Sequence, residues 1–135
     1  VSGVPSDERE RLANPSREKA LLAFIKQLPK PAVAFCDDDY VASLFCRVAE
    51  HLGLSVPGDL AVLGYFDMMI ARFSTPTISS LPGSGQAVGE KGMRLLEDLL
   101  AGKQAPRNLV MVPPPPIVER ESTGGTTIRD DDIRR

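Results

Sequence analysis

Residues 31–67 place a helical pattern between two short apolar runs, and this order constrains the fold more than any other part of the chain. The apolar runs are residues 32–36 and 60–65, and residues 40–53 carry apolar side chains three and four positions apart. A strand, a helix and a second strand predict a parallel pair, because parallel strands need a crossover connection. Ligands of open parallel sheets bind beyond the carboxyl ends of the strands, so the residues after each strand are candidate site residues.

Length, composition and charge exclude several classes of protein. The chain has 135 residues, 42% of them hydrophobic and 25% charged, which suits one globular domain with its own core. The apolar runs are far shorter than the ~20 residues of a membrane helix, so no membrane association is expected. A net charge of −2 lacks the basic excess of a nucleic-acid surface, and the chain should not bind DNA by itself.

Cysteine usage and the first residues of the chain bear on its compartment. Cys36 and Cys46 lack the spacing of a zinc site, so both are predicted to be small buried hydrophobic residues. Residues 1–15 carry no basic segment followed by an apolar one, which is the pattern of a secretory signal. These features favour the cytoplasm, where thiols stay reduced.

Further helices and strands follow the same alternation. Residues 19–28 predict a helix, and residues 77–81 predict a third strand. Residues 86–102 form the clearest helical pattern of the chain. That helix is expected to turn one apolar stripe inward, made of Val88, Met93, Leu95, Leu96, Leu99 and Leu100.

The ends of the chain and its proline-rich stretch predict irregular structure. Residues 1–15 are rich in glycine, proline, serine and asparagine and predict a loop or arm. Residues 109–112 and 117–119 flank four consecutive prolines and predict two short extended segments near a sheet edge. Residues 123–135 predict a polar tail. The expected folded part is residues 16–122, an α/β unit with a parallel sheet flanked by helices.

Four segments of the chain, in this order, resemble the sugar-sensing domain of lactose-repressor-type regulators. They are residues 28–42, 51–67, 76–103 and 112–124. The last one matches a pattern written VPPxxVxxRxST with an acidic segment after it, through residues 112–116, Val118, Arg120, Ser122, Thr123 and residues 130–132. This pattern is most similar to the sensors of xylose operon regulators, in which a helix-turn-helix domain of the arabinose-regulator type follows.

The resemblance implies a fold and a function. Such sensors have two similar α/β subdomains with the sugar between them, and this chain resembles the C-terminal portion of that type I periplasmic-binding-protein-like fold. The implied function is to bind a small sugar such as xylose and thereby control DNA binding by a transcription regulator. Operator DNA would be contacted only by a domain outside this chain, toward which residues 123–135 lead, and a homodimer is expected. With half of the cleft absent, the chain alone should bind sugar weakly.

At the first strand exit, Asp37 and Asp38 stand where the resembled family has an acidic or Asn-Asp pair that contacts sugar hydroxyls. A carboxylate accepts two hydrogen bonds and therefore suits a vicinal diol. The alternative is that Asp38 or Asp39 only caps the helix that begins near Tyr40. For Asp39, a capping or solvated position is predicted.

At the second strand exit, the family usually has an Asp in a Gly-x-Asp sequence, where this chain has Phe66 and then Asp67. Either Asp67 takes the role of the family residue, or Phe66 covers the C–H face of the sugar. An N-cap role for Asp67, at the turn that follows, is an equal alternative. At the third exit, Ser80 matches a polar residue near the ligand, with ordinary strand polarity as the alternative.

No catalytic, metal-binding or cofactor-binding set is predicted, and the chain is not expected to be an enzyme. It has a single histidine, so a nucleophile, base and acid cannot be assembled around it. Residues 37–39 suggest a divalent cation or phosphoryl transfer, but no phosphate-binding loop accompanies them. Two alternatives to a regulator stay open: a sugar-binding receptor of a transport system and a phosphoryl-transfer enzyme.

Overall fold

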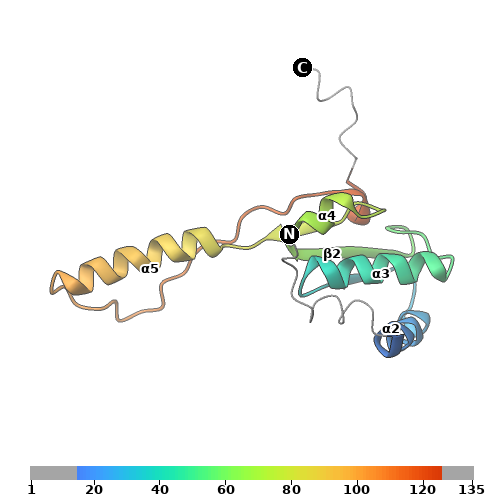
Figure 1. The fold of residues 1–135 in the computed structure, drawn as a ribbon, viewed down its shortest axis with the longest axis horizontal. Helices are drawn as coiled ribbons and strands as arrows, with labels where there is room; N and C mark the ends of the chain where they lie inside the picture. The colour runs from blue at the N-terminus through green and yellow to red at the C-terminus, as the bar shows by residue number, and fades with distance from the viewer. Residues whose placement is uncertain (1–14, 126–135) are drawn as a thin grey trace, which may run out of the picture.

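A three-stranded parallel sheet organises residues 15–125, the part of the chain that the computed structural model describes (Figure 1). Its strands, in the order β1-β2-β3, are β1 (Ala32–Phe35), β2 (Leu60–Phe66) and β3 (Ser79–Pro82). Ala32 pairs with Leu60, and Leu63 pairs with Ser79. All three carboxyl ends therefore meet at one edge, and the predicted α/β fold with a parallel sheet is confirmed.

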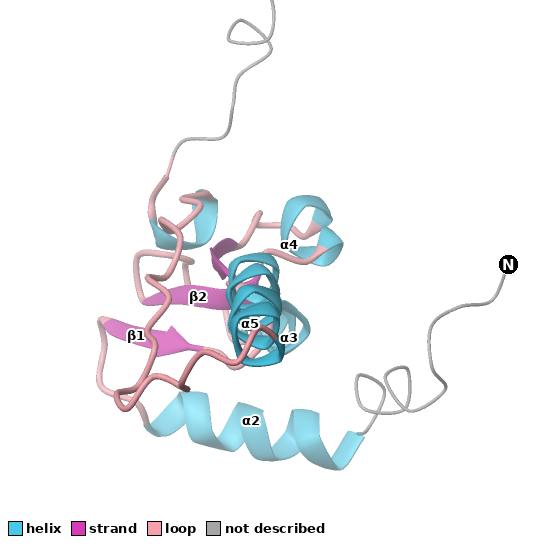
Figure 2. Cartoon of the chain, turned by 90° about the vertical axis from the view of Figure 1, so that its left-hand side faces the viewer, coloured by secondary structure: helices cyan, strands magenta, loops and turns pink. Residues whose placement is uncertain are grey.

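Helix α3 (Asp39–His51) forms the crossover and packs on one face of the sheet, with α2 (Pro15–Gln27) packed against it (Figure 2). Apolar residues at helical spacing give α3 one face for burial. The core contains Ile25, Cys36, Ala42, Leu44, Cys46, Val48, Ala49, Leu60, Val62, Ala71 and Ile78. Cys36 and Cys46 are free and buried, as predicted, and burial raises the pKa of the Cys36 thiol to about 12.

The chain returns to the sheet after a long excursion and closes against β3. Val118 forms an antiparallel bridge with Ser80, and the 3-10 turn η1 (Glu121–Thr123) packs beside β2. Of the two predicted extended segments, only residues 117–119 pair with the sheet, through Val118. The expectation for residues 109–112 is wrong, because they run outside the sheet, where no strand offers them backbone partners.

Helix α5 (Gly85–Leu100) has nearly the predicted bounds, but the expectation that its apolar stripe points inward is wrong. None of its residues is buried, and Val88, Met93, Leu96, Leu99 and Leu100 are all exposed. Figure 1 shows the reason: α5 leaves the sheet after β3 and projects away from α2, α3 and the strands. An amphipathic sequence specifies that one face needs a cover, but not which surface supplies it.

The face of the sheet opposite α3 is also open at β1. Val33 and Phe35 point away from the core and are 78% and 64% exposed. Within residues 15–125, helices therefore cover only one face of the predicted sheet. None of the helices in these residues is long and apolar enough to cross a membrane. The predicted arm up to residue 14 and the tail from residue 126 lie outside the described residues.

Candidate functional site

The candidate site lies where the chain leaves β1 and β2. Residues 37–39 follow β1, and the neighbouring strand β2 ends at Phe66, with Asp67 and Met68 directly after it. A hydrogen bond of 2.6 Å from the Met68 N–H to the Asp39 carboxylate joins the two exits directly. Polar groups that are distant in sequence therefore converge at the edge where open parallel sheets bind ligands.

Asp38 is the N-cap of α3, as the capping alternative predicted. Its backbone is extended, and its Oδ1 accepts a hydrogen bond of 2.7 Å from the Val41 N–H. The side chain is nevertheless half-buried rather than enclosed, and the preceding Asp37 is exposed. Capping uses one carboxylate oxygen, so this geometry is compatible with a second hydrogen bond from a ligand hydroxyl.

Asp39 differs from its prediction, because it is neither the cap nor solvated. It is the first residue of α3, and its side chain is completely buried. Its Oδ2 accepts the Met68 N–H, while no hydrogen bond within residues 15–125 reaches Oδ1, which lies against Gly64. Burial raises the pKa of the Asp39 carboxyl above its ordinary value. Hydrogen bonding to the Ser80 hydroxyl and the Met68 amide lowers that pKa, but by less than burial raises it.

Phe66 and Asp67 form a turn of unusual backbone geometry. Their φ angles are +88° and +51°, in the left-handed region that side chains other than glycine rarely adopt. The Phe66 ring is 54% exposed and lies 4.1 Å from the Tyr65 ring, measured between centroids. An exposed aromatic ring therefore stands at the end of β2, paired in register with Pro82 of β3.

The Asp67 carboxylate is held by two arginines. Its Oδ1 lies 2.7 Å from Arg120 Nη2, and its Oδ2 lies 3.0 Å from Arg72 Nη2. The Arg120 pair is largely buried, whereas the Arg72 side chain is exposed. Burial raises the pKa of Asp67, but the two arginines outweigh it and hold that pKa below its ordinary value. Helix α4 (Met69–Phe73) takes Met68 as its N-cap, so Asp67 does not fill the capping role.

Ser80 supports the turn from inside the sheet. It is completely buried on β3, and its hydroxyl accepts a hydrogen bond of 3.0 Å from the Asp67 N–H. Ser80 thus contacts the Asp67 amide from beneath the surface, while Asp38 and Phe66 lie at the same edge of the sheet. Asp38 and Asp67 are partly buried, and Phe66 is exposed.

Arg120 is the residue of this site that the sequence did not predict. Its Nη1 donates to the Ile78 carbonyl at 2.7 Å, and its Nη2 donates to Asp67. Ser122 secures the same segment, because its hydroxyl donates to the Val62 carbonyl at 2.6 Å and accepts from the Ser79 N–H at 2.8 Å. Both residues belong to the VPPxxVxxRxST pattern, but the pattern alone does not say which partner each one meets.

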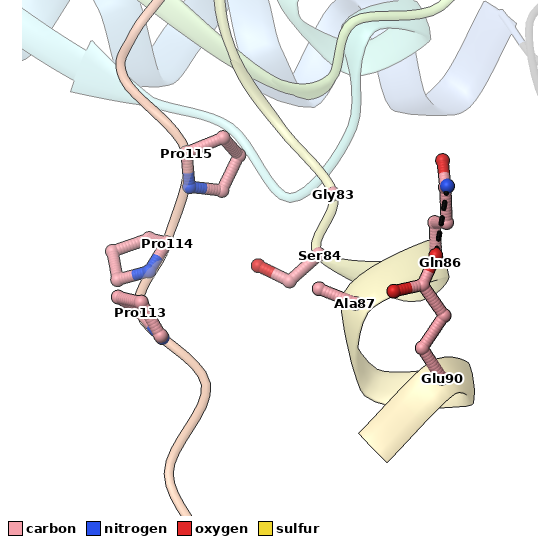
Figure 3. Close-up of a pocket in the computed structure, with 8 residues that line it drawn as sticks. All are labelled: Gly83, Ser84, Gln86, Ala87, Glu90, Pro113, Pro114 and Pro115. Atoms are coloured by element: carbon pink, nitrogen blue, oxygen red, sulfur yellow. Dashed lines mark hydrogen bonds between the residues drawn. The ribbon is translucent and has the colours of Figure 1, made fainter. Parts of the chain in front are cut away.

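A pocket of about 420 Å³ lies between the start of α5 and the prolines of the return segment (Figure 3). Pro113, Pro114 and Pro115 stand on one side, and Ser84 and Ala87 face them from the other. None of the predicted site residues lines it. Within the described part of the chain, no group of three His, Cys, Asp or Glu side chains is placed to hold a metal ion.

Comparisons with known proteins agree with this architecture. Residues 2–123 match the model of the periplasmic binding protein-like domain. The HTH-type transcriptional repressor PurR of Pectobacterium atrosepticum is 30% identical over 112 residues, which cover 83% of this chain and 33% of that protein. The chain spans about a third of the length of the curated relatives it matches, and their names describe transcriptional repressors rather than enzymes.

Two solved structures extend the comparison to three dimensions. The xylose-binding transcription activator xylR has a TM-score of 0.70 and 27% identity, over 86% of this chain and 31% of that one. A LacI family transcriptional regulator from Arthrobacter sp. FB24, in complex with lactose, has a TM-score of 0.64 and 26% identity, over 78% of this chain and 40% of that one. This chain therefore has the fold of a part of such sensor domains.

Proposed function

Because the chain belongs to the periplasmic binding protein-like domain family, we propose that it is part of the effector-binding domain of a transcription regulator whose effector is a small sugar such as xylose. The observation that carries this proposal is the convergence of Asp38, Phe66 and Asp67, from two strand exits, at one edge of a parallel sheet. Sugar as the ligand class is supported by two structural neighbours, one named as xylose-binding and one in complex with lactose.

The residues at this edge suit a sugar chemically. Asp38 offers a carboxylate to ligand hydroxyls, with Asp37 exposed beside it. Phe66 offers an apolar ring face to the C–H groups of a pyranose or furanose ring. Asp67 forms ion pairs with Arg72 and Arg120. In the proposal it accepts a hydrogen bond from a ligand hydroxyl, while Arg120 keeps its carboxylate ionised and in place.

The uncovered surfaces support a longer protein in which this chain is one of two subdomains. The apolar stripe of α5 and the β1 side chains Val33 and Phe35 lack cover within residues 15–125. Large apolar side chains exposed together mark interaction surfaces in soluble proteins. The same proposal assigns operator DNA to another domain of the longer protein, since the chain's own net charge is −2.

Calorimetric titration of D-xylose, L-arabinose and D-glucose tests the proposed function. We expect saturable binding of a sugar to the longer regulator and much weaker binding to the 135-residue chain, because sensors of small ligands bury most of the ligand surface between two walls. If the longer protein binds none of these sugars, the proposed sugar effector is wrong.

Two substitutions of Asp38 separate capping from ligand binding. Asn caps helices about as well as Asp, so Asp38→Asn should leave the thermal stability near that of the unsubstituted protein, while sugar binding weakens by about 1–3 kcal/mol through loss of a charged hydrogen bond. Asp38→Ala should in addition lower the free energy of unfolding by about 1 kcal/mol. Unchanged calorimetric affinity in Asp38→Asn would show that Asp38 is only a cap.

The exposed stripe of α5 should make the 135-residue chain self-associate when it is expressed by itself. Sedimentation velocity over a wide concentration range is expected to show dimers or larger species at the highest loading. The paired change Leu96→Glu and Leu100→Lys places good helix formers of opposite charge four residues apart on one face of α5 and should shift the chain toward monomer. A chain that sediments as a monomer at every loading would contradict this prediction.

A further inference from the structure

The Asp39 carboxylate is the one charged side chain in the described part of the protein that is buried completely. It sits at the start of α3 and reaches across to the exit of β2, where its Oδ2 accepts the Met68 N–H at 2.6 Å. No hydrogen bond from residues 15–125 reaches Oδ1, which lies where a Cβ at Gly64 would stand. A carboxylate in such a place is costly, because burial removes its water without supplying full compensation.

The peptide that Asp39 holds belongs to the turn that carries the proposed sugar contacts. Met68 directly follows Phe66 and Asp67, whose left-handed backbone is strained and persists only because the surrounding structure holds it. Ser80 holds the Asp67 N–H from β3, and Asp39 holds the next N–H from α3. Two buried side chains thus fasten two consecutive amides of one turn.

Two charged side chains from other segments, Asp67 and Arg120, influence the Asp39 carboxyl. Asp67 faces it from the turn and raises its pKa, whereas Arg120 faces it from the C-terminal segment and lowers it. Asp37 and Asp38 precede it in the chain, and both are closer to solvent. Asp39 therefore meets the turn through its hydrogen bond from the Met68 N–H, beside the Ser80 hydroxyl that holds the Asp67 N–H.

We propose that Asp39 is a positioning residue: by accepting the Met68 N–H, it sets the turn geometry that presents Phe66 and Asp67, and so sets effector affinity without touching the effector. The affinity part rests on the proposed function. The turn-holding part rests only on the contacts of Asp39, Gly64, Met68 and Ser80.

The first test uses amide resonances of the 135-residue chain in ¹H–¹⁵N spectra. In the unsubstituted chain, the Met68 amide proton should shift with pH in step with the Asp39 carboxyl carbon, because its acceptor gains a proton. In Asp39→Asn this pH-dependent shift should disappear, and the Phe66 and Asp67 amides should move as the turn relaxes. The control Glu50→Gln makes the same chemical change at an exposed position of α3 and should leave these three amides unchanged.

The second test measures D-xylose affinity in the longer regulator. Asp39→Asn should weaken binding about tenfold or more, the loss expected for one charge-assisted hydrogen bond, whereas Glu50→Gln should not. If Asp39→Asn does not fold, the pH titration of the unsubstituted chain tests the proposal by itself. A Met68 amide shift that does not change as Asp39 titrates overturns the proposal. Affinity within twofold of the unsubstituted protein also overturns it. If no sugar binds the unsubstituted regulator, the proposed function fails, and the amide shifts alone decide whether Asp39 holds the turn.

Discussion

Replacing Arg120 by methionine is expected to lower the free energy of unfolding of the 135-residue chain by about 3 kcal/mol. The guanidinium pairs with Asp67 at 2.7 Å in a largely buried position and also donates to the Ile78 carbonyl. Removing one partner of a buried pair leaves the other charge uncompensated, which costs about 3–5 kcal/mol when the site is fully enclosed. In the variant, Asp67 keeps its Arg72 contact and some exposure to water, so we expect a loss at the lower end of this range. Urea denaturation followed by circular dichroism measures it.

Arg72→Met is the matched control, because Arg72 binds the same carboxylate from the solvent side. Its side chain is 60% exposed, and exposed ion pairs contribute about 0–1 kcal/mol. Losses of similar size in the two variants would contradict the importance of the buried pair.

The same pair should appear in the pH dependence of stability. Since the arginines hold the pKa of Asp67 below its ordinary value of 3.8, the stabilisation is complete above that value and is lost as the pH falls through the folded-state pKa. Arg120→Met should therefore flatten this part of the acid-side decline. The raised pKa of Asp39 acts in the opposite sense, because its ionisation favours the unfolded chain as the pH rises.

Gly64→Ala is the second large effect, with an expected loss of about 3 kcal/mol or failure to fold. A Cβ at Gly64 would collide with Asp39 Oδ1, lie 3.0 Å from Asp39 Cγ and lie 3.3 Å from Ile78 Cγ2. Overpacking a core typically costs about 1–3 kcal/mol, and here the displaced group is also a buried carboxylate with one hydrogen bond. Chemical denaturation, or solubility if no folded protein forms, measures the loss.

Gly92→Ala provides the contrast on α5. Nothing lies within 4 Å of the position of its Cβ, and alanine is favoured over glycine in a helix by roughly 0.5–1 kcal/mol. The variant should therefore be as stable as the unsubstituted chain or more so. A Gly64→Ala chain with unchanged stability would mean that Asp39 can leave Gly64 without cost.

Arg120 also bears on how a ligand signal would leave the site. It joins Asp67, at the proposed effector contact, to the segment that continues through η1 toward the C-terminal tail. Ser122 fastens the same segment to β2 and β3 through the Val62 carbonyl and the Ser79 N–H. In the regulator we propose, any effector that moves the Asp67 turn also acts on this segment through a direct ion pair.

The sequence alone determined the local elements and the edge of the sheet that carries the site. Apolar runs of strand length around a helical pattern predict parallel strands, because backbone hydrogen bonding leaves few other solutions. The exits that hold Asp38, Phe66 and Asp67 followed from the same reasoning, as did the capping alternative for Asp38. These properties depend on near neighbours in the chain, which a sequence displays directly.

Only the tertiary structure decided which of these side chains are buried and what each one meets. Asp39 looks in sequence like its neighbours Asp37 and Asp38, but the crossing of α3 over β2 places it against Gly64, 25 residues later, and under the Met68 amide. Arg120 reaches Asp67 across 53 positions, and no local pattern encodes that distance. The stripe of α5 is amphipathic in sequence and uncovered in the structure, because periodicity reports that a face is apolar while only the packing of distant segments supplies its partner.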